Sequence, residues 1–339
     1  METILYLAHT EEDGSLSKAA LEVVSAAKDL ASGLSGSLAI GLVGRDVQAA
    51  ADALAGCGAA TIYGASGEAF AVSRYSTDVA ALQALCQAAK PTLVISVADS
   101  RLSRAMPGVA QRLGGRIDTH LTGLSVKDGQ PLATRWYYRQ RMVADFNRPQ
   151  RPWFLTVDAG CFAAYAGAPG QAQVQAVTPV LPVERTKVLG IQSPAADQQT
   201  IRPDAQVLFV TGAGWTKKQA DGATHVPEAA ALILGFLNGT KASLGSSKSL
   251  VDMGGEGESV LPFLTHLHQV GQTGSTPRHP KGLATCCHGE EPHVVGWRFI
   301  TERRAVNLDA GCGWARGKAD VLYVTDAFAL MKRVNELLG

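Results

Sequence analysis

Residues 4–43 read ILYLAHTEEDGSLSKAALEVVSAAKDLASGLSGSLAIGLV, and this stretch decides the fold. The apolar run Ile4–Ala8 predicts a buried strand, and the polar turn that follows it ends at Ser17, a suitable helix N-cap. Apolar residues then recur at helical spacing, and Leu38–Val43 is a second apolar run typical of a strand. A strand, a helix and a strand of these lengths predict a parallel βαβ unit.

The same alternation continues through the first half of the chain and predicts an open, doubly wound α/β sheet. The further elements that we expect are a helix at Val47–Gly56, a strand at Thr61–Tyr63, a helix near Val79–Ala89 and a strand at Thr92–Val97. The segments Trp136–Val143 and Trp153–Val157 are predicted to be antiparallel additions to that sheet.

A polar segment punctuated by prolines, 173–203, separates this half from a second α/β pattern. That pattern begins with a strand at Gln206–Val210, followed by a helix at Pro227–Asn238 and a short strand around Ala242–Leu244. We therefore expect two α/β domains, 1–203 and 204–339, each with a mostly parallel open sheet flanked by helices.

The composition of the 339-residue chain excludes several classes of protein. Lys plus Arg total 31 and Asp plus Glu total 30, so the electrostatic case for binding nucleic acid or an anionic membrane is absent. With 46% hydrophobic residues, the chain is not predicted to be disordered. Residues 1–10 lack the basic segment of a signal peptide, and the longest apolar run, Ala229–Leu237, is about half of what a bilayer requires. We expect a cytoplasmic protein with no inserted segment.

Neither a metal site nor a catalytic residue is predicted. The six cysteines show no CxxC spacing, and the histidines between 266 and 293 lack a converging third ligand. Arginines and aromatic residues alternate over 136–153, which is a pattern found in single-stranded nucleic-acid sites. Because the chain is neutral overall, a subunit interface or an edge strand is the favoured interpretation.

Three loops in the second half carry groups suited to a phosphate or a polar ring. Gly212-Ala213-Gly214 follows a strand, so its backbone amides can approach a phosphate, although an ordinary strand-to-helix turn has the same pattern. The loop Gly245–Ser249 combines hydroxyls with the ammonium of Lys248, and a solvated serine-rich loop is the alternative. QVGQTG at 269–274 offers donors and acceptors to a ring edge, or is a polar surface turn.

The string GSSKSLVD at 245–252 is similar to the Gly-Ala-Ser-Arg-Ala-Ala-Val-Asp loop of electron-transfer flavoprotein α subunits. QVGQTG matches the string of that family letter for letter, and His293 falls on the family's flavin-ring histidine. Asn307 and Asp309 fall on its Ala-Ile-Asn-Lys-Asp segment, and Ala319-Asp320 on its closing Ala-Asp pair. Residues 4–17 and 99–118 are similar more loosely. The chain therefore resembles a divergent member of this family.

The resemblance implies a division of labour. The N-terminal domain would dock on a β subunit to form a heterodimer, and the C-terminal domain would be a Rossmann-like domain that binds FAD. The protein would accept electrons from a flavin-containing dehydrogenase and pass them toward the respiratory chain. It would be a redox-active carrier rather than an enzyme with a small-molecule substrate of its own.

The resemblance also implies roles for particular residues. Lys248 would take the place of the family arginine over the flavin ring, with Thr273 near N5 and His293 near O2. Asn307 and Asp320 would hold the ribose and adenosine end. Further contacts to the cofactor are implied for Gly212, Ser247, Gln269, Val270, Gly271, Gln272, Gly274 and Asp309.

The chain departs from the family pattern around the implied cofactor. Family residues are replaced at Trp215, Lys248, Cys286, Cys287, His288 and Leu308. These departures lead to the hypothesis of a paralogue that serves one dedicated dehydrogenase in a stable larger complex. Two alternatives stay open: a redox-inert assembly subunit that has kept the fold but lost FAD, and a nucleotide-binding sensor for AMP or ATP.

Overall fold

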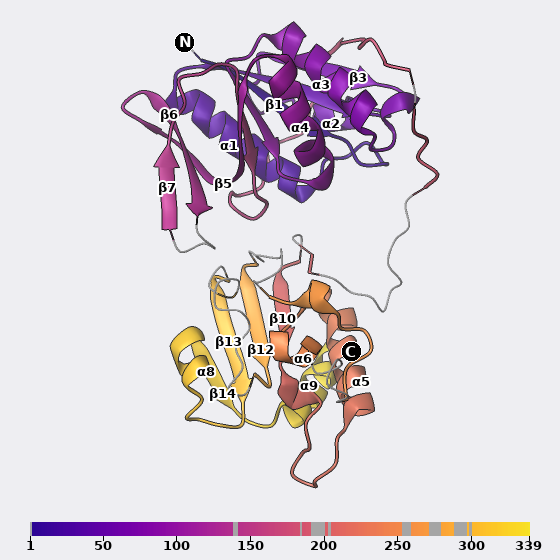
Figure 1. The fold of residues 1–339 in the computed structure, drawn as a ribbon, viewed down its shortest axis with the longest axis vertical. Helices are drawn as coiled ribbons and strands as arrows, with labels where there is room; N and C mark the ends of the chain where they lie inside the picture. The colour runs from indigo at the N-terminus through magenta and orange to yellow at the C-terminus, as the bar shows by residue number, and fades with distance from the viewer. Residues whose placement is uncertain are drawn as a thin grey trace. The chain divides into compact units, whose positions relative to one another are not determined.

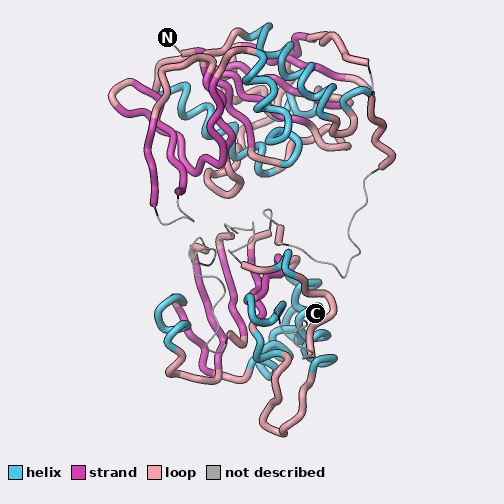
Figure 2. The backbone as a smooth tube through the Cα atoms, viewed as in Figure 1, coloured by secondary structure: helices cyan, strands magenta, loops and turns pink. Residues whose placement is uncertain are grey.

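The computed structural model describes residues 2–137, 142–183, 185–190, 201–202, 205–252, 259–270, 279–287, 297 and 300–339. The chain divides into two compact units, 1–190 and 191–339. In each unit helices flank a β-sheet (Figure 1 and Figure 2). The expected α/β class, with parallel and mixed sheets, is confirmed.

A nine-stranded sheet in the order β7-β6-β5-β8-β4-β1-β2-β3-β9 forms the centre of the first unit. Six of the eight pairings among its described strands are parallel, and the β5–β6 and β6–β7 pairings are antiparallel. The elements are β1 (Thr3–His9), α1 (Lys18–Gly33), β2 (Ser37–Gly44), α2 (Gln48–Ala53), β3 (Thr61–Ser66), η1 (Glu68–Phe70), α3 (Tyr75–Ala89), β4 (Leu93–Val97), α4 (Ser100–Arg112), β5 (Arg116–Lys127), β6 (Gln130–Tyr137), β7 (Met142–Phe146), β8 (Trp153–Val157) and β9 (Val174–Ala176).

The first strand and helix form where the local sequence predicts them. The hydroxyl of Ser17 accepts a hydrogen bond from the Ala20 amide at 3.2 Å, which confirms the N-cap of α1. Successive strand residues point to opposite faces of a sheet. Tyr6 faces α1, where its hydroxyl donates to the Ala20 carbonyl, while Leu7 lies on the face covered by α3. Both faces are covered, so the central strands are buried.

One strand differs from the expectation. Trp153–Val157 forms β8, which lies between β4 and β5 and runs parallel to both, so its prediction as an antiparallel addition is wrong. All five residues of β8 are buried, and four of them are apolar, which is typical of a parallel strand that is covered on both faces. The antiparallel addition around Trp136–Val143 is confirmed for its described part, because β6 and β7 pair antiparallel.

A five-stranded sheet in the order β11-β10-β12-β13-β14, with every pairing parallel, forms the second unit. Its elements are β10 (Val207–Thr211), η2 (Ala213–Trp215), α5 (Val226–Thr240), β11 (Ser243–Ser246), α6 (Lys248–Asp252), η4 (His266–His268), β12 (Lys281–Thr285), β13 (Glu302–Asn307), α8 (Gly313–Lys318), β14 (Val321–Val324) and α9 (Ala327–Leu338). Helices α5 and α9 pack together over one face of this sheet, and α8 contributes to the core on the other face.

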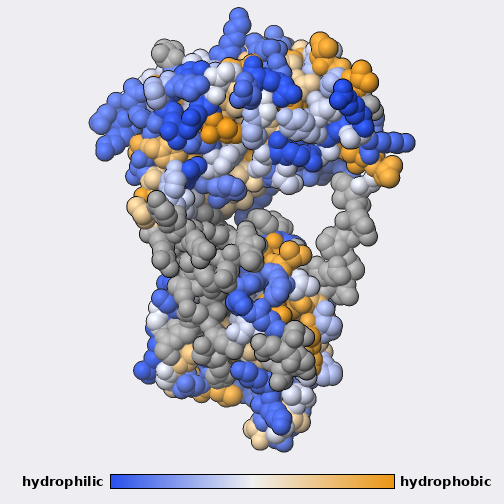
Figure 3. Space-filling view, in the orientation of Figure 1, coloured by the Kyte–Doolittle hydropathy of each residue, from blue (hydrophilic) through white to orange (hydrophobic). Residues whose placement is uncertain are grey.

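The apolar residues of the first unit are mainly internal, and on the face drawn in Figure 3 this unit is mostly hydrophilic with scattered apolar groups. The most exposed large apolar side chains, Val180, Val183 and Leu189, lie on the extended segment that ends the unit. Among the helices that the structure describes, none combines the length and the apolar character needed to cross a membrane.

Candidate functional site

The strands of the second sheet end on one edge, and the loops that leave this edge carry most of the predicted site residues. Strands β10, β11, β12 and β13 end at Thr211, Ser246, Thr285 and Asn307. In open α/β sheets, ligands bind outside the carboxyl ends of the strands, at the point where the order of winding reverses. The strand order puts that point between β10 and β12, so the candidate site is the carboxyl edge of β11, β10, β12 and β13 (Figure 1).

At the reversal point, the turn after β10 packs directly on the turn after β12. The Gly212 amide donates to the carbonyl of Thr285 at 2.8 Å, and the Gly214 amide donates to the carbonyl of Cys286 at 3.1 Å. A Cβ atom on Gly212 would lie 2.3 Å from the carbonyl oxygen of Cys286. Gly212 is therefore required for the close approach of two backbone segments.

Trp215 is the last residue of the same turn, and its side chain packs in the core. The residue is fully buried, its Nε1 donates to Thr285 Oγ1 at 2.8 Å, and its ring centroid lies 4.7 Å from that of Phe328 on α9. The indole is thus part of the core and presents no charge at the carboxyl edge. No local pattern in the sequence indicates where this side chain lies, because both of its contacts come from segments far along the chain.

The end of β11 and the segment Gln269–Val270 lie side by side. The Val270 amide donates to the Ser246 carbonyl at 3.1 Å, and Ser246 pairs with Gln269 in an isolated parallel bridge. The hydroxyl of Ser247 accepts a hydrogen bond from the Leu250 amide at 3.4 Å. The fully buried hydroxyl of Ser246, in contrast, has no hydrogen-bond partner among the described residues. A buried hydroxyl without a partner is costly, so it points to a further polar group at this edge.

Helix α6 begins at Lys248, whose half-exposed side chain forms an ion pair with Asp252 one turn later. The other carboxylate oxygen of Asp252 lies 3.7 Å from Nδ1 of His266 on η4. The ammonium group of Lys248, predicted as the cation of the site, is therefore at the carboxyl edge and forms an ion pair with the carboxylate of Asp252. The four-residue spacing between Lys248 and Asp252 is a sequence signal that predicts this pair, whereas no pattern in the sequence points to His266.

Asn307 and Asp309 form a tight turn after β13. Asn307 Oδ1 accepts a hydrogen bond from the Asp309 amide at 3.0 Å, and Asp309 Oδ1 accepts one from the Gly311 amide at 2.7 Å. Asn307 is buried, with an exposed fraction of 3%. The hydrogen bond to its oxygen fixes the side chain and leaves the amide nitrogen available as a donor.

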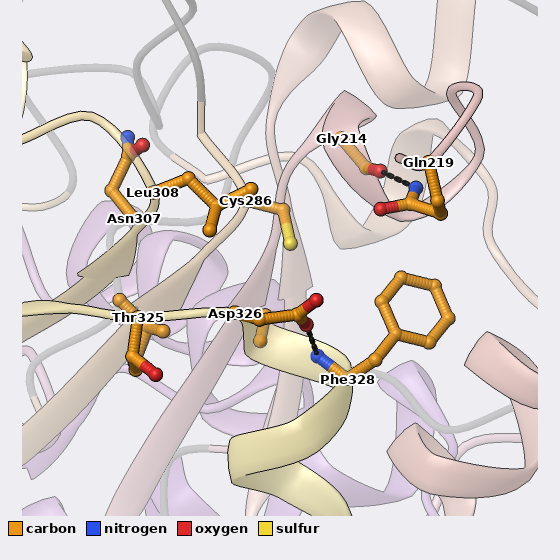
Figure 4. Close-up of a pocket in the computed structure, with 10 residues that line it drawn as sticks. Gly214, Gln219, Cys286, Asn307, Leu308, Thr325, Asp326 and Phe328 are labelled. Atoms are coloured by element: carbon orange, nitrogen blue, oxygen red, sulfur yellow. Dashed lines mark hydrogen bonds between the residues drawn. The ribbon is translucent and has the colours of Figure 1, made fainter. Parts of the chain in front are cut away.

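A cavity of about 30 Å³ lies beside this turn, between η2, the ends of β12 to β14 and the start of α9 (Figure 4). Cys286 points its sulfur into the cavity from a backbone φ of 58°, in the left-handed region that favours glycine. Burial, together with the carboxylate of Asp326, raises the pKa of the Cys286 thiol, so the thiol stays neutral. The cavity has room for about one or two water molecules, so it is not a cofactor pocket by itself.

The structure places seven predicted residues at this edge: Gly212, Ser247, Lys248, Gln269, Val270, Asn307 and Asp309. Asp320 lies instead at the amino end of β14, at the opposite end of the sheet from Asn307. There it accepts hydrogen bonds from the Arg303 amide and guanidinium at 2.7 and 2.9 Å, and the guanidinium above all lowers the pKa of Asp320. The predicted residues Gly271, Gln272, Thr273, Gly274 and His293 lie outside the described residues.

Metal-ligating side chains do not gather at this edge. Within the described ranges, no three His, Cys, Asp or Glu residues are grouped so that they could hold a metal ion. His266 and His268 are the first and last residues of η4. Nδ1 of His268 accepts a hydrogen bond from the Thr265 amide and so closes a capping box at the start of this turn. The described residues at this edge therefore offer hydroxyls, side-chain amides and the ammonium group of Lys248 to a ligand.

Comparison with known proteins identifies the family. Residues 4–182 match the electron transfer flavoprotein domain, which covers more than half of the chain. The chain belongs to the electron transfer flavoprotein family. The resemblance inferred from the motifs is thereby confirmed.

The similarity extends over both units. The chain is 27% identical over 308 residues to protein FixB of Clostridium saccharobutylicum, with 88% of this chain and 85% of that protein covered. It is 26% identical to electron transfer flavoprotein subunit alpha of Thermoanaerobacterium thermosaccharolyticum, with 84% and 83% covered. It is also 26% identical to the subunit alpha of Mycobacterium leprae, with 91% and 89% covered. The chain is thus a divergent relative of the family's α subunits.

Proposed function

We propose that this chain is the FAD-binding α subunit of an electron-transfer flavoprotein. One observation carries the proposal. At the carboxyl edge of the second sheet, the buried hydroxyl of Ser246 has no hydrogen-bond partner within the described part of the chain. Because the chain belongs to a flavoprotein family, a flavin is the ligand that we propose as the hydrogen-bond partner of this hydroxyl. Residues 204–339 would form the Rossmann-like FAD domain and residues 1–203 the domain that docks on a β subunit.

The residues at this edge fit FAD in their chemistry. FAD combines a polar ring, hydroxyl groups and phosphates, which require donors and a neighbouring positive charge. The unpaired hydroxyl of Ser246, the amide nitrogen of Asn307 and the ammonium of Lys248 provide such groups on three neighbouring loops. When bound, FAD supplies the electron-accepting chemistry, and the chain binds and orients it.

Each loop would make a different contribution. Gly212 would hold the turns after β10 and β12 together, so that the edge keeps its shape. Asn307, fixed by its bond to Asp309, would donate from its side-chain amide. The remaining contacts are assigned to Ser247, Gln269, Val270, Gly271, Gln272, Thr273, Gly274 and His293. We assign Asp320 to joining β13 and β14 through Arg303 rather than to the cofactor.

The proposed partners follow from the α-subunit assignment. The chain would form a heterodimer with a β subunit, accept electrons from a dedicated flavin-containing dehydrogenase and pass them toward the respiratory chain. The departures from the family pattern around Lys248 and Trp215 favour a single donor, held in a stable complex. The six cysteines are all free thiols, which suits the reducing cytoplasm.

The proposal is tested by co-expressing the chain with its β subunit and recording the absorption spectrum of the purified complex. Released cofactor is then identified by chromatography. Flavin bands and about one FAD per heterodimer are expected. A colourless complex that takes up no added FAD would refute the proposal and favour the redox-inert assembly subunit.

A matched pair of asparagine variants sharpens this test. Asn307→Ala removes a buried side-chain amide at the proposed site, so FAD should be lost more readily during dialysis. Asn238→Ala changes an exposed asparagine on α5 and should retain FAD like the parent protein. Equal retention of FAD by the two variants would count against the proposed site.

A further inference from the structure

Lys248 does not stand alone at the carboxyl edge of β11. Its ammonium contacts Oδ2 of Asp252, and Oδ1 of the same carboxylate lies 3.7 Å from Nδ1 of His266. Asp252 is thereby held from two sides, by the first residue of its own helix and by η4, which packs against α6. The carboxylate is less exposed, at 32%, than Lys248, at 54%.

The pair contributes little to the stability of the helix. An exposed ion pair at this spacing is worth about 0.3–0.5 kcal/mol, and the order with the cation first is the weaker of the two. Helix α6 has only five residues, so it is held by its neighbours rather than by this contact. The main consequence of the pair is where it places the ammonium and how much of its positive charge is offset.

The same edge carries independent signs of a ligand. Ser246, two residues before Lys248, has a buried hydroxyl with no hydrogen-bond partner in the described part of the chain, and the loop after β13 offers the amide of Asn307. Trp215 is buried in the core, so this position of the turn after β10 presents no charge to a ligand. Within the described residues 247–252 of the loop after β11, Lys248 and Asp252 are the charged side chains, so together they set the charge that this segment presents to a ligand.

We propose that Asp252 is a positioning residue, which anchors the Lys248 ammonium at this edge and offsets its charge toward the bound cofactor. The inference rests on the proposed function. Reduction adds negative charge to a flavin, and an unpaired cation nearby stabilises that charge more than a paired one does. Asp252 thus keeps the reduction potential of the cofactor lower than Lys248 alone would set it.

Substitutions on the two sides of the pair should shift the potential in opposite directions. Asp252→Asn leaves Lys248 unpaired and should favour the reduced cofactor by about tenfold, which is about 30 mV for a two-electron couple. Lys248→Ala leaves the carboxylate unpaired and should disfavour the reduced cofactor by a similar factor. The potential is measured on the complex with its β subunit, by reductive titration against a reference dye.

A second measurement does not depend on the cofactor. Acylation of Lys248 by acetic anhydride, followed by mass spectrometry, reports whether its amine is held in the ion pair. Asp252→Asn should make this amine react several-fold faster, both with and without bound FAD.

The control removes the same charge at a distance. Glu336 pairs with Arg333 at 2.9 Å near the end of α9, a helix that starts at the carboxyl edge and runs away from it. Glu336→Gln should change the potential less than twofold and leave acylation of Lys248 unaffected.

The outcomes separate the two proposals. Faster acylation together with a raised potential in Asp252→Asn supports the inference. FAD bound with an unchanged potential overturns it while leaving the proposed function standing, and so does unchanged acylation of Lys248. A complex that takes up no FAD overturns the proposed function and, with it, this inference.

Discussion

The contact between the turns after β10 and β12 predicts a large effect for a very small change, Gly212→Ala. The added methyl carbon would lie 2.3 Å from the carbonyl oxygen of Cys286, 2.4 Å from its carbonyl carbon and 2.6 Å from Cα of Cys287. All three atoms belong to the backbone, so no side chain can rotate to make room. The backbone φ of Gly212 is −103°, which alanine adopts without strain, so the expected effect is purely steric.

The magnitude follows from the contacts that must open. An added methyl group in a packed interior costs about 1–3 kcal/mol, and immovable neighbours place this case at the upper end. Separating the turns also weakens the hydrogen bonds from Gly212 to Thr285 and from Gly214 to Cys286, worth about 1 kcal/mol each. The second unit should therefore lose about 3–5 kcal/mol in free energy of unfolding.

Hydrogen exchange followed by mass spectrometry measures this loss within the second unit alone. Peptides from β10 and β12 should lose protection by roughly a hundredfold or more, because about 3 kcal/mol corresponds to that factor. Gly317→Ala is the control: nothing lies near its Cβ position in α8, and alanine there should stabilise the helix by about 0.5–1 kcal/mol. Unchanged protection of β10 in Gly212→Ala would refute the reasoning.

Three further variants test other parts of the molecule. Ser246→Ala removes a buried hydroxyl that has no partner among the described residues, so the free energy of unfolding of the cofactor-free protein in urea should rise by about 1 kcal/mol while FAD affinity falls; a gain in FAD affinity would contradict this. Asp118→Asn removes a carboxylate that accepts two hydrogen bonds from Arg148 at 2.9 and 3.0 Å. The free energy of unfolding at pH 7 should therefore fall by about 2–3 kcal/mol. Burial alone would raise the pKa of Asp118, but the bonds from Arg148 lower it, so this contribution is present above pH about 4 and disappears as the pH falls through the folded value. If Asp118→Asn lost the same free energy of unfolding at pH 7 and at strongly acidic pH, the carboxylate of Asp118 would not be the source of this stabilisation. For His9, burial alone would lower the pKa, but the hydrogen bond to Asp99 at 3.1 Å raises it. The stabilisation is therefore complete below pH about 6.5 and is lost as the pH rises through the folded value. In His9→Gln this pH-dependent step should vanish from a series of urea titrations, and its persistence would assign the step to another group.

Local signals in the sequence predicted the elements that depend on nearby residues. The strand at Ile4–Ala8 and the helix at Pro227–Asn238 lie within β1 and α5, and Ser17 caps α1 as predicted. Each is specified by apolar spacing or by one capping side chain. The direction of Trp153–Val157 was predicted wrongly, because long-range packing determines which strands become neighbours; its mostly apolar sequence was the local signal that favours a parallel strand.

The candidate site was predicted only in outline, for a related reason. Loops after parallel strands share an edge, so the proximity of Lys248 and Asn307 to the same edge follows from chain order once the strands are known. The burial of Trp215 depends on Thr285 and Phe328, 70 and 113 positions along the chain, and no spacing rule reaches so far. That the hydroxyl of Ser246 has no partner among the described residues depends on the positions of surrounding segments, which no local sequence pattern gives.

The central claim, that FAD binds at the carboxyl edge of the second sheet, is tested most directly by labelling the site. The complex with its β subunit is loaded with 8-azido-FAD, irradiated and digested, and the labelled peptides are identified by mass spectrometry. We predict labelling of peptides from the loop after β11, which contains Ser246–Lys248 and is assigned to the flavin ring, and suppression of that labelling by excess FAD. Labelling confined to the first unit, or labelling that excess FAD does not suppress, would contradict the claim.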